Sequence, residues 1–194
     1  MSALDQPLVW VDLEMTGLDP RKDVILEIAV IVTDGSLNTI IDGPELVIGA
    51  TPEQMGTMDP FVADMHAASG LDKLVGEAIL TVGQAETLVM DWLKEHVPES
   101  GFAPLAGNSV HTDRAFMATY MPAFEAYVHY RNVDVSTIKE LAKRWYPEYP
   151  GVAKDTESQH RALSDIRASI DELQQYRDQL FVPIALTNSS TAAP

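Results

Sequence analysis

The sequence contains no cysteine, and this absence excludes disulfides, thiolate nucleophiles and zinc–thiolate sites. Basic residues are also scarce, because 13 Lys and Arg stand against 29 Asp and Glu, for a formal net charge of -16. Binding of a long nucleic acid is driven by the release of counterions when Lys and Arg contact many phosphates, and an acidic surface supplies little of this energy. The alternative is that the negative charge only keeps the protein soluble. Any metal should therefore have oxygen or imidazole ligands, and any nucleic-acid ligand should present few phosphates.

Long apolar runs are missing as well. The longest, residues 23–32, is shorter than a bilayer span and carries two carboxylates. The first seven residues lack the basic and apolar segments of a secretory signal or transit peptide. We therefore expect a cytoplasmic protein without a membrane segment. Its 194 residues, 46% of them hydrophobic, suit one domain over residues 1–182, with the small and polar residues 183–194 as a disordered tail.

The sequence does contain an order of strands and helices typical of an α/β fold. Apolar, strand-like runs cover residues 8–13, 24–33, 45–49, 103–107 and 132–135. Helical periodicity covers residues 84–97, 113–121, 137–145 and 162–180, and Ser136 is a candidate N-cap for the third of these helices. Strands that come first, followed by helices alternating with strands, predict a mixed central sheet flanked by helices.

Asp12 and Glu14 lie two residues apart at the end of the first predicted strand. Because side chains alternate along a strand, both carboxylates point to the same side of the sheet. Two neighbouring carboxylates raise the pKa of one of them sharply unless a cation neutralises the pair. A strand that simply emerges into solvent is the alternative, but the apolar residues 9–11 favour a ligand site at the end of a buried strand.

Two later segments add two aspartates and a histidine. Asp113 opens a predicted helix, where the helix dipole alone also favours an acidic residue. Asp165 lies near the start of the last predicted helix, and His160 precedes it. Five helical positions rotate a side chain by about 140°, so these two residues face one site only if His160 lies at or before the first turn. A structural or solvated histidine is the alternative.

Four carboxylates from three separated segments, together with one histidine, suit metal-assisted hydrolysis of a phosphodiester. Two Mg²⁺ or Mn²⁺ ions would stabilise the attacking and leaving oxygens of an in-line displacement, and such hard cations prefer oxygen ligands. The histidine would act as general base on the attacking water, because its ordinary pKa is close to neutral pH. Spacing alone leaves the simpler alternatives open.

Four parts of the sequence resemble the motifs of the oligoribonuclease family, within the exonuclease superfamily named for its Asp-Glu-Asp-Asp and His residues. These parts are residues 10–19, 107–109 with 113–116, 129–131 with 134–141, and 160–166. They occur in the family's order, and the resemblance extends over about residues 7–182. It implies a ribonuclease H-like fold, a homodimer, two divalent cations and 3′→5′ hydrolysis of very short RNA, dinucleotides above all, to 5′-mononucleotides.

The resemblance also implies roles for the residues at the predicted site. Asp12, Glu14, Asp113 and Asp165 would be the metal ligands, and His160 would be the general base. All five would then be catalytic residues.

Substrate contacts follow from the same resemblance. Ser109 and Arg131 would hold the substrate's 5′ phosphate, with His66 beside them. Tyr130 would reach the site from the partner subunit, and Leu18 would be an apolar wedge against which the bases stack. The alternatives are that Tyr130 belongs to the dimer core, that Leu18 is an exposed turn residue and that His66 is a surface histidine.

A contact to the terminal phosphate would explain a preference for short substrates, because it fixes the distance from that phosphate to the scissile one. Arg131 suits this contact, since a planar guanidinium can hold a phosphate bidentately. Long duplex nucleic acid is not an expected partner. One alternative is a proofreading-type 3′→5′ exonuclease on single-stranded DNA, with the same five catalytic residues. Another is a non-catalytic acidic protein that binds Ca²⁺ or nucleotides, although the sequence lacks the Asp-x-Asp-x-Asp-Gly calcium loop.

Overall fold

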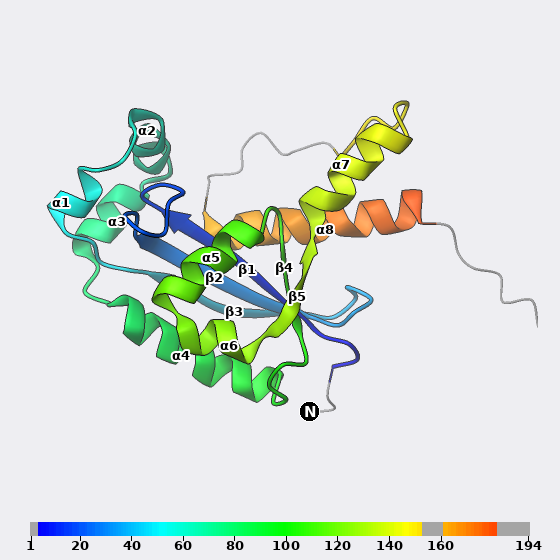
Figure 1. The fold of residues 1–194 in the computed structure, drawn as a ribbon, viewed down its shortest axis with the longest axis horizontal. Helices are drawn as coiled ribbons and strands as arrows, with labels where there is room; N and C mark the ends of the chain where they lie inside the picture. The colour runs from blue at the N-terminus through cyan, green and yellow to red at the C-terminus, as the bar shows by residue number, and fades with distance from the viewer. Residues whose placement is uncertain (1–3, 153–160, 182–194) are drawn as a thin grey trace, which may run out of the picture.

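The computed structural model describes residues 4–152 and 161–181, and its centre is a five-stranded sheet (Figure 1). The strands are β1 (Leu8–Met15), β2 (Ile25–Thr33), β3 (Ile40–Val47), β4 (Pro104–Gly107) and β5 (His129–Asp134). Their order across the sheet is β3-β2-β1-β4-β5; β1, β2 and β3 pair antiparallel, whereas β1, β4 and β5 pair parallel. The expected mixed sheet is therefore confirmed.

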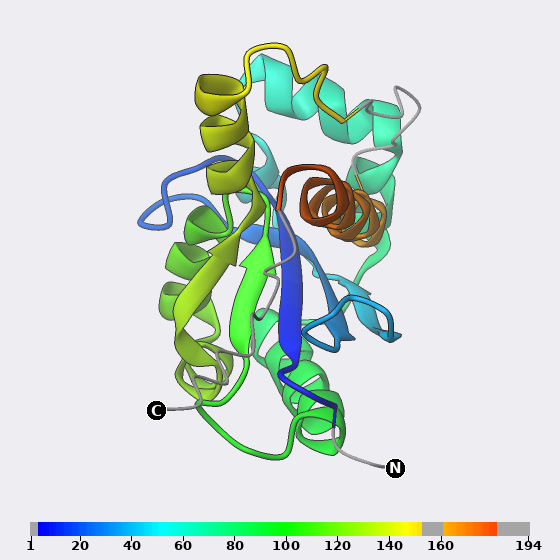
Figure 2. The same cartoon turned by 90° about the vertical axis from the view of Figure 1, so that its right-hand side faces the viewer.

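Helices lie on both faces of this sheet (Figure 2). They are α1 (Pro52–Met55), α2 (Pro60–Ser69), α3 (Leu71–Glu77), α4 (Val82–His96), α5 (His111–Tyr120), α6 (Pro122–Tyr127), α7 (Val135–Trp145) and α8 (Ala162–Leu180). Buried side chains of α4, α5 and α6 form one core with the sheet, and those of α7 and α8 form a second core on the other face. A smaller cluster packs α3 against β2.

Alternation along β1 decides which face carries the candidate site. Val9, Val11 and Leu13 belong to the core under α4 and α5, whereas Trp10 belongs to the core under α8. Residues 12 and 14 share the parity of Trp10, so their carboxylates point to the α8 face. The sheet therefore aims both side chains at the helix that carries Asp165.

Several local predictions needed correction. Helices α1, α2, α3 and α6 were not expected, and β5 begins at His129 rather than at residue 132. Strand β3 covers Ile40–Val47 rather than residues 45–49, and its first residues were missed because this edge strand is polar and half-exposed. The predicted N-cap of α7 was wrong: Asp134 is the cap, and its Oδ1 accepts a hydrogen bond from the Ser136 backbone N at 2.9 Å. The helix begins at Val135, two residues earlier than predicted, which makes Ser136 its second residue and frees the serine hydroxyl for other contacts.

The turn between β1 and β2 is held by Asp23, whose Oδ2 accepts a hydrogen bond from Asp19 N at 2.9 Å. Gly17 packs so closely on this carboxylate that an added Cβ would lie 2.5 Å from Asp23 Oδ2. The side chain of Leu18 therefore projects from a tightly fixed turn, and it is 77% exposed.

Within residues 4–152 and 161–181, none of the helices combines the length and apolar character needed to cross a membrane. Residues 183–194, expected to form a tail, lie outside the described residues, and so does His160.

Candidate active site

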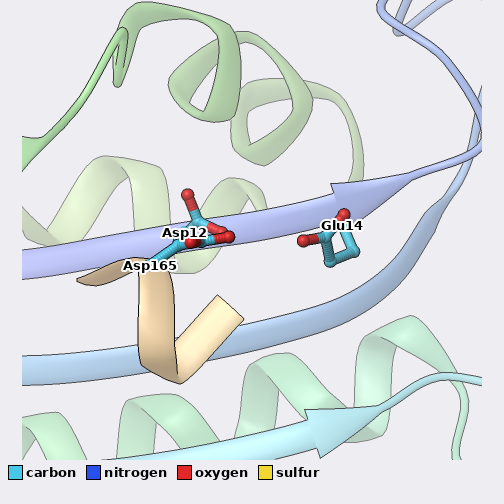
Figure 3. Close-up of side chains that lie close together, drawn as sticks. All are labelled: Asp12, Glu14 and Asp165. Carbon is cyan, nitrogen blue, oxygen red and sulfur yellow. The ribbon is translucent and has the colours of Figure 1, made fainter. Parts of the chain in front are cut away.

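Three carboxylates meet between the end of β1 and the first turn of α8 (Figure 3). One ligand atom from each of Asp12, Glu14 and Asp165 lies within 4.8 Å of the others. Strand periodicity brings the first two to one face, and the position of Asp165 one turn into α8 aims it back at them. The structure therefore brings together residues that are 151 positions apart in the sequence, as the prediction required.

A fourth carboxylate comes from the start of α5. Asp113 lies in the first turn of this helix and is 6% exposed. Its Oδ1 accepts a hydrogen bond from the backbone N of Leu13 at 3.0 Å, which ties it to β1 between Asp12 and Glu14. From the sequence, the helix dipole alone could explain an acidic residue at this position. The contact to β1 places Asp113 next to the three carboxylates, close enough for its charge to raise the pKa of Asp12.

Burial and mutual repulsion make this cluster costly to ionise. Burial, followed by the charges of Asp113, Glu14, Asp165 and Glu27, raises the pKa of Asp12 well above its usual value. The pKa of Glu14 rises to about 8, mainly through burial and then through its acidic neighbours. Burial also raises the pKa of Asp113 to about 7, despite the hydrogen bonds that favour its charged form. A buried set of oxygen donors that repel one another fits a divalent hard cation.

These pKa values predict how the stability of the metal-free protein depends on pH. A carboxyl group whose pKa is higher in the folded state binds a proton that the unfolded chain has already lost, so stability falls as pH rises between the two values. With EDTA present, we expect the melting temperature to fall from about pH 5 to about pH 8, and to fall less in Glu14→Gln.

Added Mg²⁺ or Mn²⁺ should reverse this trend, because the cation binds the ionised carboxylates and not the protonated ones. Melting curves with EDTA and with metal, each at both ends of the pH range, make the measurement. A metal-free protein that is equally stable at both ends would show that the carboxylates do not repel one another as described.

His66 lies inside the protein beside Glu14. Its side chain is fully buried, and its Nε2 donates a hydrogen bond to the backbone oxygen of Met15 at 2.9 Å. Its other ring nitrogen, Nδ1, lies 3.8 Å from Glu14 Oε2 and has no hydrogen-bond partner among the described residues. The alternative of a surface histidine is therefore wrong, and His66 supports the end of β1 from within α2.

Two residues that the sequence did not single out anchor the start of α8. Glu27 in β2 is fully buried, and its carboxylate accepts hydrogen bonds from Arg161 Nε at 2.9 Å and from the backbone N of Ala162 at 3.1 Å. No side chain of α8 itself caps this helix. Glu27 therefore caps α8 from the sheet, directly opposite Glu14 in the β1–β2 ladder. The position of Glu27 inside an apolar run of the sequence could have marked it as unusual. Its partner, Arg161, is 134 residues away and could not be identified from the sequence.

Ser109 lines a cavity of about 310 Å³ between the end of β4 and the start of α7. Its φ of +53° is left-handed, a costly conformation for a residue with a Cβ and one that concentrates at functional sites. Asp134 Oδ1 holds this backbone by accepting a hydrogen bond from Ser109 N at 2.9 Å. The Ser109 hydroxyl lies 3.1 Å from that of Ser136, so the structure adds Ser136 to the predicted set.

The other predicted substrate residues are exposed. Tyr130 is 72% exposed on β5, which is an edge strand of the sheet, and the Arg131 guanidinium lies 5.2 Å from the centre of its ring. Leu18 projects from the β1–β2 turn described above. His160 lies outside the described residues, although its neighbour Arg161 is fixed by the contact to Glu27.

Known proteins are similar to this chain in sequence and in fold. A family model described as Exonuclease (RNase_T) matches residues 9–173. The oligoribonuclease of Cutibacterium acnes is 49% identical over 176 residues, which are 91% of this chain and 87% of that protein. The human mitochondrial oligoribonuclease is 47% identical over 179 residues, which are 92% of this chain and 75% of that protein.

Solved structures with a similar fold include exonuclease I of E. coli in complex with a dA16 oligonucleotide. That chain superposes with a TM-score of 0.66 at 12% sequence identity, over 91% of this chain. Exonuclease I of Methylocaldum szegediense superposes with a TM-score of 0.58 at 18% identity, over 90% of this chain. This chain covers 42% and 41% of the lengths of those two proteins. The ribonuclease H-like fold expected from the sequence is confirmed.

Proposed function

Because this chain belongs to the oligoribonuclease family of exonucleases, we propose that it hydrolyses very short RNA from the 3′ end, dinucleotides above all, to 5′-mononucleotides. Family membership makes it a nuclease, a hydrolase of phosphodiesters. The observation that carries the proposal is the cluster of buried Glu14 with half-buried Asp12 and Asp165, and Asp113 is tied to the same strand. These four carboxylates have the oxygen donors and the mutual repulsion that a divalent cation relieves.

In this proposal, Asp12, Glu14, Asp113 and Asp165 hold two divalent cations, Mg²⁺ or Mn²⁺. When bound, the cations would stabilise the negative charge that develops on the oxygen of the attacking water and on the leaving oxygen of the phosphodiester. His160 accepts the proton of the attacking water, a task that suits an imidazole near neutral pH. Its position immediately before Arg161 supports this role, because the Glu27 contact fixes the chain at that point.

The substrate's 5′ phosphate binds at the cavity beside Ser109. Hydroxyl groups of Ser109 and Ser136 lie side by side there, and Arg131 is exposed on the strand that leads into α7. Leu18 supplies an apolar contact for the bases from its rigid turn. His66 acts from inside, through Glu14, rather than at the phosphate, since its ring is fully buried.

A homodimer completes this site. The supporting observation is an edge strand, β5, that presents a largely exposed aromatic side chain, Tyr130. Exposed aromatic residues are enriched in protein interfaces. In the dimer, the Tyr130 side chain of one subunit reaches the substrate in the other. A cytoplasmic location stays a prediction from the sequence.

Relative turnover on three substrates tests the proposed function. We expect kcat/KM on a 5′-phosphorylated dinucleotide to exceed that on a 20-nucleotide RNA by at least about tenfold, because only the dinucleotide fills both the 5′ phosphate site and the carboxylate site. Single-stranded DNA should be turned over more slowly still. Product analysis by chromatography should show 5′-mononucleotides.

Equal rates on the dinucleotide and the long RNA would contradict the proposed preference for short substrates. Faster turnover of single-stranded DNA would favour a proofreading-type exonuclease. Asp12→Asn measured in parallel controls for contaminating nucleases, because it removes a proposed metal ligand with little change in side-chain volume.

A further inference from the structure

A partly buried hydrogen-bond network adjoins Ser109, and its central residue is Asn108. The amide Nδ2 of Asn108 donates hydrogen bonds to Ser169 Oγ at 2.9 Å and to Glu172 Oε2 at 3.1 Å, both on α8. On its other side, Asn108 Oδ1 accepts a hydrogen bond from Ser136 Oγ on α7 at 2.9 Å. One side chain at the end of β4 therefore joins the two helices of the α8 face.

Glu172 fixes the orientation of this amide. Its side chain is buried, yet Lys139 Nζ lies 2.7 Å from Oε1 and the Tyr176 hydroxyl donates to the same oxygen at 2.9 Å. Burial raises the pKa of Glu172, but these hydrogen bonds and the one from Asn108 outweigh it and hold the pKa below its usual value. An ionised carboxylate only accepts hydrogen bonds, so the NH₂ of Asn108 must face it and Oδ1 must face α7.

The orientation of the amide sets the direction of the hydrogen bonds at the surface. The single proton of the Ser136 hydroxyl goes to Asn108 Oδ1, which cannot donate. Ser136 Oγ can then only accept from Ser109 Oγ, 3.1 Å away. The Ser109 hydroxyl therefore donates its one proton to Ser136 Oγ. If that proton turns toward an anion instead, Ser136 still keeps its own hydrogen bond to Asn108. Its own backbone N–H is already used by Asp134.

The same amide also contacts the helix that carries a candidate metal ligand. Ser169 Oγ accepts from Asn108 and donates to the backbone oxygen of Asp165 at 2.8 Å. A continuous series of hydrogen bonds thus leads from the surface hydroxyl of Ser109 through Asn108 to the first turns of α8. The two ends of this series are the proposed 5′ phosphate site and the carboxylate site.

We propose that Asn108, oriented by the Glu172–Lys139 ion pair, is a positioning residue that sets the preference of this enzyme for a 5′-phosphorylated dinucleotide. It fixes the Ser136 hydroxyl, and through it the Ser109 hydroxyl, at one place relative to α8. Hydroxyls that are already held in place lose less entropy when the phosphate binds. This inference rests on the proposed function, because it takes Ser109 as a contact of the 5′ phosphate.

The experiment compares a diadenosine carrying a 5′ phosphate with the same dinucleotide carrying a 5′ hydroxyl, in the wild type and in Asn108→Ala. We expect the wild type to prefer the phosphorylated substrate in kcat/KM. In Asn108→Ala this preference should fall about tenfold, as expected for the loss of one net hydrogen bond. The fall should come from a higher KM for the phosphorylated substrate. Both kcat and turnover of the 5′-hydroxyl substrate should stay within about threefold of wild type.

Two further variants separate positioning from a general effect on folding. Glu172→Gln keeps an oxygen next to Asn108 but removes the charge that orients the amide, so it should lose part of the same preference. The double variant Asn108→Ala with Ser136→Ala is compared with each single variant. Its loss of preference for the 5′-phosphorylated substrate should be no greater than that of the more affected single variant, because both residues act through one series of contacts. Asn38→Ala is the matched control, since this exposed asparagine also donates to a serine, Ser36 Oγ at 3.1 Å, far along the chain from the site.

An equal loss on both dinucleotides in Asn108→Ala and Glu172→Gln would overturn the inference, and so would additive losses in the double variant. Either result would make the network a support of the fold. If the wild type prefers the phosphorylated substrate and Asn108→Ala keeps that preference, the inference fails and the proposed function stands. If the wild type itself shows no preference, the proposed 5′ phosphate site fails and the inference fails with it.

Discussion

Asp12→Asn should lower kcat on a 5′-phosphorylated dinucleotide about a thousand-fold or more while the protein stays folded. The substitution keeps the shape of the side chain and removes one negative oxygen from a group of carboxylates within 4.8 Å of one another. A cation held by the remaining carboxylates would be bound more weakly and in an altered position. Single-turnover kinetics at saturating Mn²⁺ measure the chemical step, and calorimetry measures the affinity for the metal.

The same substitution should make the metal-free protein more stable. The pKa of half-buried Asp12 is raised by desolvation and by four acidic neighbours, so its ionisation opposes folding at neutral pH. A rise in melting temperature with EDTA, combined with the loss of kcat, would be the signature of a residue kept for chemistry at the expense of stability. Near wild-type kcat in Asp12→Asn, and also in His160→Ala, would show that the active site lies elsewhere.

Glu27→Ala should lower the free energy of unfolding by about 3 kcal/mol, because it leaves a partly buried guanidinium without its main partner. The Glu27 carboxylate accepts hydrogen bonds from two nitrogens of Arg161 and from the first backbone N–H of α8. The Arg161 side chain is only 23% exposed. Loss of these contacts should also loosen the start of α8 and weaken metal binding at Asp165. Urea denaturation with EDTA measures the first effect, and calorimetric titration with Mn²⁺ measures the second.

A second ion pair between α8 and the sheet provides the control. Arg167 Nη2 lies 2.6 Å from Asp42 Oδ2, but both side chains are more than half exposed. Exposed pairs contribute about 1 kcal/mol or less, so Asp42→Ala should change stability and metal affinity little. If Glu27→Ala were no more harmful than Asp42→Ala, the anchoring role described for Glu27 would be wrong.

Local patterns were sufficient to predict the parts of the site that depend on local geometry. The two-residue period of β1 placed Asp12 and Glu14 on one face, and the helical pattern placed Asp165 in an early turn of α8. Asp113 was predicted at a helix start, but its hydrogen bond to Leu13 joins segments 100 residues apart and has no local signal.

Other features depended on contacts that no local pattern contains. Glu27 looked like an interruption in an apolar strand, since its partner Arg161 is distant in the sequence. The choice of Asp134 over Ser136 as N-cap depends on where β5 ends, and that point is set by pairing with β4. Short helices such as α1 and α3 gave too little periodicity to be recognised, and packing against β2 stabilises α3.

The order of the elements along the chain has a consequence for the protein while it is being synthesised. β1 emerges from the ribosome first with two of the acids, α5 brings the third, and α8 brings the fourth after all five strands. A chain that ends before α8 lacks Asp165, and His160 has no fixed helix start beside it. Such a nascent or truncated chain carries an incomplete set of the ligands that we propose. We therefore expect the nuclease to become active only after α8 has been synthesised.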